Sequence, residues 1–217
     1  MTALCNAHEG TFWPGLRWLE FAAMAEKQKV VIVLPITGFA DWGLDLPLNV
    51  EETMSMSVLR EASQQLYGVI KHLVLPPLRF VLGPTESSFF ATDPDTAHET
   101  LREMVISIKE SGFRKVVFYN SSPWNEAFLN VAGRDLRIEL GMQMFSINLA
   151  GIGLDLKPDR STTRDDCRIL GANQASDRAK SILEKSAGRL VALLKEVAVR
   201  EPLPNDGEIP TKQGDEG

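Results

Sequence analysis

The stretch LPITGFADWGLDLPLNVEE, from Leu34 to Glu52, decides how the chain is interpreted. It begins inside a β-branched run, Val30 to Ile36, that is typical of a strand buried on both faces. Its glycines and prolines indicate a loop, and its two final acids are typical of the first turn of a helix. It contains no histidine and no cysteine. Three alternatives remain: a catalytic loop, the remnant of one, or a simple strand-to-helix connection.

The composition predicts one α/β domain over residues 1–200. The chain has 217 residues, of which 44% are hydrophobic and 24% charged, and this length suffices for a closed core. The net charge of −6 argues against nucleic-acid and acidic-membrane partners. No apolar run reaches the roughly 18 residues of a membrane span, and no basic-then-apolar leader opens the chain. We expect a cytoplasmic protein with reduced cysteines.

Strand and helix patterns alternate along the chain. This alternation predicts a three-layer α/β/α fold with a mostly parallel sheet. The segment from Arg160 to Asn173 is expected to be irregular, and residues 201–217 to be a disordered tail. The expected central strands are Val30 to Ile36, Lys115 to Asn120 and Gln143 to Leu149, and the expected helices are Arg17 to Gln28, a helix that begins after Asn49, Thr92 to Ser111, a helix that ends at Leu140, and Ser176 to Val199.

Two loops matter most for function. In parallel sheets, ligands bind beyond the carboxyl ends of the strands. The loops in question run from Thr37 to Asn49 and from Ser121 to Asn125. Because both leave the same edge of one sheet, we expect five side chains to converge on one pocket: Trp42, Asp45, Glu51, Ser122 and Trp124.

Both loops resemble signatures of the creatininase family of metal-dependent amidohydrolases. The first family signature reads roughly P-V-G-S-x-E-Q-H-G-P-H-L-P-L-G-x-D, and Pro35 to Glu51 is similar to it without a gap. The second, N-G-H-G-G-N, is similar to N-S-S-P-W-N at Asn120 to Asn125. SSFFATDPDTAHETL and LGANQAS are similar to two further family segments in the expected order. The resemblance covers about Trp18 to Val199 and implies a creatininase-like fold.

The resemblance also implies where metal ligands would stand. Family members bind two divalent metals, but the matching glutamate and first histidine are Ala40 and Trp42 here. The second-loop histidine is Ser122, a position that supplies a carboxylate in some members is Trp124, and the aspartate is Glu51. A catalytic divalent site needs about three protein ligands. We therefore predict no metal and no other cofactor, with Asp41, Asp45 and Glu51 left open as a rebuilt oxygen site.

The first functional hypothesis is a metal-independent enzyme that acts on a small polar or cyclic molecule. Acid–base chemistry favours isomerisation, dehydration, cyclisation or decarboxylation over amide hydrolysis. The expected catalytic residues are Glu51, Asp45 and Ser122. The expected substrate-binding residues are Asp41, Trp42, Asn120, Ser121, Trp124 and Asn125.

The alternative hypothesis is a non-catalytic subunit that assembles with itself or with an active homologue. Family members are typically homohexamers, so the resemblance implies a homo-oligomer. Trp42 and Trp124 either fill the vacated metal cavity or form aromatic walls for a ligand. Glu51 and Glu52 suit a helix start whatever the function, and Ser122-Pro123 suits a helix cap. A serine hydrolase is disfavoured because no histidine lies near the second loop.

Overall fold

In the computed structural model, the described residues are 9–43, 46–83, 88–157, 161–172 and 176–201, so the predicted tail lies almost entirely outside them. Four strands form a parallel sheet in the order β3-β1-β6-β7, and a short fifth strand extends beside the end of β1. These are β1 (Val31–Thr37), β3 (His72–Val74), β4 (Leu78–Arg79), β6 (Lys115–Asn120) and β7 (Gln143–Asn148). The three predicted central strands therefore share one sheet, which confirms the fold class.

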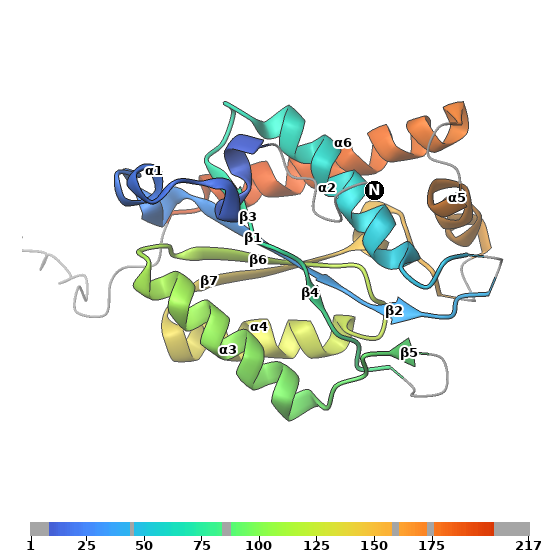
Figure 1. Ribbon diagram of the computed structural model, residues 1–217, viewed down its shortest axis with the longest axis horizontal. Helices are drawn as coiled ribbons and strands as arrows, with labels where there is room; N and C mark the ends of the chain where they lie inside the picture. Colours follow the sequence, from blue (N-terminus) through green and yellow to red (C-terminus); the bar gives the residue numbers. More distant parts are fainter. Residues whose placement is uncertain (1–8, 44–45, 84–87, 158–160, 173–175, 202–217) are drawn as a thin grey trace, which may run out of the picture.

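Helices cover both faces of this sheet (Figure 1). One face packs against α2 (Val50–Leu66) and α6 (Asp177–Val199), and the other against α3 (Pro94–Glu110) and α4 (Glu126–Leu140). α5 (Ser161–Ala172) packs against α2 and α6. A hydrophobic core lies on each face of the sheet, and alternate residues of β1 pack into one or the other. This follows because successive side chains of a strand point to opposite faces. No helix in the described part of the chain is long and apolar enough to span a membrane.

Several helix ends follow the sequence signals. The Asp93 side chain accepts a hydrogen bond from the Thr96 amide at the start of α3, and Ser176 does the same for Ala179 at the start of α6. Gly141 ends α4 with φ of 61°, a left-handed conformation that glycine adopts without a Cβ clash. Asn49 stands at the N-cap of α2, but its side chain makes no capping bond.

Two segment predictions were wrong. Only Trp18–Ala22 (α1) is α-helical within the predicted helix Arg17 to Gln28, because Glu26 adopts a left-handed φ of 55° and turns the chain. The segment predicted to be irregular contains α5, whose Cys167 and Leu170 are fully buried. Its high content of polar residues concealed a narrow apolar stripe.

The remaining elements are short. A separate two-stranded antiparallel sheet joins β2 (Phe39–Ala40), in the first loop, to β5 (Ser88–Phe89). Four 3-10 turns complete the described chain, namely η1 (Glu9–Thr11), η2 (Trp13–Gly15), η3 (Lys27–Lys29) and η4 (Leu149–Ile152).

Candidate functional site

The two loops begin side by side at the carboxyl edge of the sheet. Ile36 of β1 is paired with Asn120 of β6, and the Ser121 amide donates to the Ile36 carbonyl at 3.0 Å. The first loop then returns through β2 to α2, and the second leads to α4. This register brings the start of α2 next to the second loop, as the strand order predicted.

Glu51 lies at the centre of the site. Its side chain is fully buried in the first turn of α2. Oε1 accepts a hydrogen bond from the Trp42 indole Nε1–H at 2.8 Å, and Oε2 accepts one from the Gly38 amide at 3.1 Å. Both donors are neutral, so no cation among the described residues compensates a charge on this carboxylate through a hydrogen bond or ion pair.

Burial raises the pKa of Glu51 to about 7. The hydrogen bonds from Trp42 and Gly38 lower the pKa in part, because they stabilise the ionised form. The hydroxyls of Ser122 and Ser121 act in the same direction, although neither makes a hydrogen bond of good geometry to the carboxylate. Glu51 therefore holds its proton up to near-neutral pH.

Gly38 separates Glu51 from Ser122. A Cβ on this residue would lie 2.7 Å from Glu51 Oε2 and 3.1 Å from Ser122 Oγ. The first distance is shorter than real Cβ contacts, so the close packing around the carboxyl requires glycine. The Gly38 amide is also one of the two donors to Glu51, which the sequence patterns did not reveal.

The indoles of Trp42 and Trp124 stack directly on each other. Their ring centroids are 4.6 Å apart and the ring planes differ by 18°. Trp42 is only 8% exposed. Trp124 is partly buried and packs closely against Gly83, where a Cβ would lie 2.9 Å from the indole ring. This separation is that of a direct offset stack, so no third ring fits between the two indoles. They occupy the space between the two loops.

Arg164 of α5 also reaches this site. Its Nη2 donates to the Trp42 backbone carbonyl at 3.1 Å and thereby ties α5 to the first loop. Its Nε is buried and has no hydrogen-bond partner within the described residues. Sequence reasoning missed Arg164 because it lies in the stretch that was predicted to be irregular.

The two asparagines that were predicted to bind substrate instead form hydrogen bonds within the protein. Asn125 accepts from the Leu82 amide and donates to the Phe80 carbonyl, at 2.9 and 3.0 Å. Asn120 donates to the Ser122 carbonyl and to Asn148, and accepts from the Ser122 amide. The side-chain amides of both asparagines therefore hold the second loop and its neighbours in place. The hydrogen bonds that a substrate would need are already made within the protein.

The hydroxyls of the second loop differ. Ser121 Oγ donates to the Ile36 carbonyl at 3.4 Å. Ser122 is fully buried, and its Oγ has no hydrogen-bond partner in the described part of the chain. Ser122 does not cap α4, because that helix begins at Glu126 with Asn125 at its N-cap. The predicted cap pair Ser122-Pro123 was therefore wrong.

The predicted carboxylates do not all join the site. Asp41 is exposed, and its Oδ1 accepts from the Gly43 amide in a local turn. Asp45 lies outside the described residues. Among the residues that are described, no group of three histidine, cysteine or acidic side chains is placed to hold a metal ion. The structure thus brings together Trp42, Glu51, Ser122 and Trp124, and leaves Asp41 apart.

A second buried acid follows Glu51. Glu52 is 1% exposed and forms a bidentate ion pair with Arg79 of β4, with N–O distances of 2.9 and 2.7 Å. This pair fixes the start of α2 against the sheet. It was missed because the partners are 27 residues apart in the sequence.

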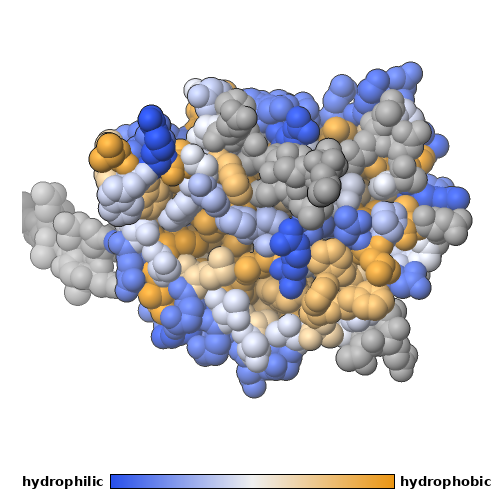
Figure 2. Space-filling view, in the orientation of Figure 1, coloured by the Kyte–Doolittle hydropathy of each residue, from blue (hydrophilic) through white to orange (hydrophobic). Residues whose placement is uncertain are grey.

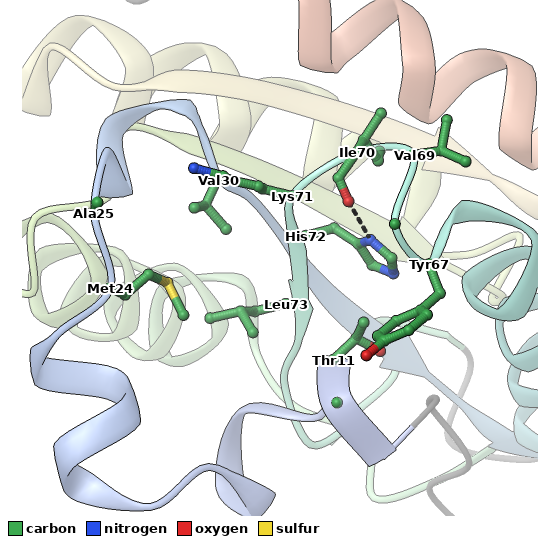
Figure 3. A pocket seen from close by; sticks show the side chains of 12 residues that line it. Thr11, Met24, Ala25, Val30, Tyr67, Val69, Ile70, Lys71, His72 and Leu73 are labelled. Carbon is green, nitrogen blue, oxygen red and sulfur yellow. Dashed lines mark hydrogen bonds between the residues drawn. The ribbon is translucent and has the colours of Figure 1, made fainter.

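A cavity lies at the opposite end of the sheet, where the parallel strands begin. It has a volume of about 700 Å³ and lies beside the starts of β1 and β3. Figure 3 shows His72 and Tyr67 on one side of it, with Met24 and Leu73 on the other. His72 Nε2 lies 2.9 Å from Ser63 Oγ, which in turn contacts Thr11 Oγ1 at 2.9 Å. None of the predicted site residues lines this cavity.

Comparison with known proteins places the fold. The creatininase family, described as creatinine amidohydrolase, matches residues 15–188. A putative creatinine amidohydrolase from Bacteroides fragilis NCTC 9343 superposes with a TM-score of 0.69 at 13% identity, covering 91% of this chain and 100% of that one. A structure described as creatininase Mn gives 0.66 at 16% identity, with 88% and 99% covered.

No curated protein sequence matches this chain. At 13–16% identity, the structural similarity shows the fold alone. The family match extends over most of the chain, from the first helix into α6. The chain belongs to the creatininase family.

Proposed function

We propose that this protein is a non-catalytic member of the creatininase family that serves as a subunit of an oligomer, with itself or with an active homologue. The observation that carries the proposal is the direct stack of Trp42 on Trp124 at 4.6 Å, with the Trp42 Nε1–H on Glu51. In this arrangement, the side chains at the former ligand positions fill the site themselves. A substrate has no access to Glu51 unless the indoles move apart.

The donor set does not suit the pair of divalent metals that the family implies. Indole, methyl and single hydroxyl groups stand where imidazole and carboxylate ligands would be needed. Both oxygens of Glu51 already accept hydrogen bonds from N–H groups, and burial holds its proton near neutral pH. A protonated carboxyl surrounded by donors is a poor ligand for a cation. The residues present support a site without metal chemistry.

An exposed hydrophobic patch beside the site supports the assembly role. It is formed by Phe89 of the small β2–β5 sheet and by Phe90, which follows β5, and these residues are 47% and 69% exposed; Phe90 packs edge-on against the half-buried Phe39 of β2. Figure 2 shows the hydrophobic surface over this part of the molecule. Phe90 has a left-handed φ of 57°, which is uncommon for a bulky residue. Exposed aromatic patches of this kind favour protein contacts.

The test combines assembly with activity. We expect light scattering after gel filtration to show an oligomer that Phe90→Asp dissociates. Ile138→Asp is the matched control, since Ile138 is an equally exposed hydrophobic residue on α4 outside the patch. We expect no turnover of creatinine or related cyclic amides. A monomeric wild type, or turnover that Glu51→Gln abolishes, would contradict the proposal.

A second candidate, a metal-independent acid–base enzyme, is favoured by one pair of observations. The pKa of Glu51 is near 7, and Ser122 Oγ lies close by without a hydrogen-bond partner within the described residues. A carboxyl of that pKa suits proton transfer at neutral pH. This function requires Trp42 to swing away from Glu51. It predicts turnover of a small polar molecule that falls about 10²-fold in Glu51→Gln.

A further inference from the structure

A small basic cavity lies away from the indole site, between α5, α6 and the turn η4. Its volume is about 230 Å³. Among the described residues that line it, the three cations all come from α6: Arg178, Lys185 and Arg189. Their spacings of seven and four residues place them on one face of the helix, directed toward the same hollow.

The position of Arg189 depends on a glycine. Its Nη1 donates to the Ile152 carbonyl at 3.0 Å, which fixes one edge of the guanidinium. A Cβ on Gly153 would lie 2.1 Å from this nitrogen, and Gly153 has a φ of 94°. The backbone at the end of η4 thus leaves the room that the guanidinium occupies. The other N–H groups of Arg189 have no hydrogen-bond acceptor among the described residues.

The cavity carries an excess of positive charge. Asp166 of α5 is the one carboxylate among the described residues that line it. It lies 3.5 Å from Arg178, whose side chain is 67% exposed. Lys185 has no carboxylate partner among the described residues. Three cations and one anion leave a local charge of +2 in a chain whose net charge is −6. A concave cluster of one sign concentrates counter-ions.

We propose that this cavity binds a phosphate group. Two guanidinium groups and an ammonium supply the forked and point-charge donors that phosphate oxygens accept. The volume lies below the roughly 300 to 1,000 Å³ of ordinary ligand pockets. The ligand is therefore inorganic phosphate or a small phosphate monoester rather than a whole nucleotide. This site is independent of whether the indole site is catalytic.

Calorimetric titration of the full chain with inorganic phosphate and with glycerol 3-phosphate, at constant ionic strength, tests the proposal. We expect binding of one equivalent, weakened about tenfold by Lys185→Gln or Arg189→Gln through loss of a charge-assisted hydrogen bond. Lys195→Gln is the matched control, because Lys195 lies on another face of the same helix. It should leave affinity unchanged.

The two ligands distinguish the source of the phosphate group. Tighter binding of inorganic phosphate identifies the free anion, and tighter binding of the ester identifies a phosphorylated metabolite. Equal affinities show that the phosphate group alone is recognised, which also supports the proposal. Gly153→Ala keeps all three cations but displaces Arg189, so it should weaken binding in a chain whose circular dichroism is native. Absence of binding, or equal weakening by Lys185→Gln and Lys195→Gln, would overturn the proposal.

Discussion

Glu51 and Glu52 are adjacent in the first turn of α2, and both are almost completely buried. Their partners are nevertheless of different kinds. Glu52 faces Arg79 in a bidentate ion pair, whereas Glu51 faces the indole of Trp42 and the amide of Gly38. One side of the turn compensates a buried charge with an opposite charge. The other compensates it only with neutral dipoles.

This difference affects the protonation of the two carboxyls. A buried carboxylate with neutral donors is left near the point of protonation, and the pKa of Glu51 is raised to about 7. A cation at this position, whether a metal ion or an arginine, would have lowered that pKa. Under the proposed function, the Glu52 side of α2 stabilises the fold, and the Glu51 side is a closed site in which an indole stands where a cation would be needed.

Breaking the ion pair should have the largest effect. Arg79→Ala leaves Glu52 buried without its cation. We expect the free energy of unfolding to fall by about 3 kcal/mol, the low end for buried pairs, because Arg79 itself is 39% exposed. Chemical denaturation measures this change. Arg102→Ala is the control, since Arg102 is about as exposed as Arg79 but its partner Glu139 is 40% exposed, and this substitution should cost less than about 1 kcal/mol. Equal effects of the two substitutions would contradict the contrast between the two glutamates.

Glu51→Gln sharpens the comparison through pH. The folded pKa of about 7 lies above the ordinary glutamate pKa of 4.5, so between these two pH values the folded chain binds more protons than the unfolded chain. The stability that Glu51 contributes is therefore present below about pH 4.5 and lost as pH rises toward 7. We expect wild type to lose on the order of 3 kcal/mol relative to Glu51→Gln across this window. A difference independent of pH would mean an ordinary pKa.

Trp42→Phe is expected to have a smaller effect. Phenylalanine keeps a stacked ring but lacks the N–H that donates to Glu51 at 2.8 Å. We expect a loss of about 1–3 kcal/mol at pH 8 from the unsatisfied carboxylate, and a smaller loss at pH 5, where Glu51 is protonated. Denaturation at both pH values checks this. Trp18→Phe, at a residue 75% exposed, should change neither value.

Periodicity and capping predicted most of the fold. Buried β-branched runs gave the central strands, and Asp93, Gly141 and Ser176 mark helix ends in both the sequence and the structure. The failures were α5, whose apolar stripe is narrow, and the segment around Glu26, where a left-handed residue interrupts an otherwise helical pattern. Sequence patterns within a short segment do not show where packing against the rest of the protein determines the local structure.

The site was predicted less completely than the fold. Strand order alone placed the two loops together, so the meeting of Trp42, Glu51 and Trp124 followed from topology. The contributions of Gly38 and Arg164 depend on backbone approach and on a helix from a distant segment. Asn120 and Asn125 form hydrogen bonds with backbone groups of the protein. Residue type alone does not show whether an asparagine bonds to the backbone or to a ligand.

The metal content of the purified protein tests the central claim most directly. The chain would be expressed with added Zn²⁺ and Mn²⁺, dialysed and analysed for both elements. Because neutral donors occupy Glu51 and indoles fill the space between the loops, we expect no stoichiometric metal. About two ions per chain, the number in a bridged divalent site, would contradict the account and indicate Asp41, Asp45 and Glu51 as replacement ligands.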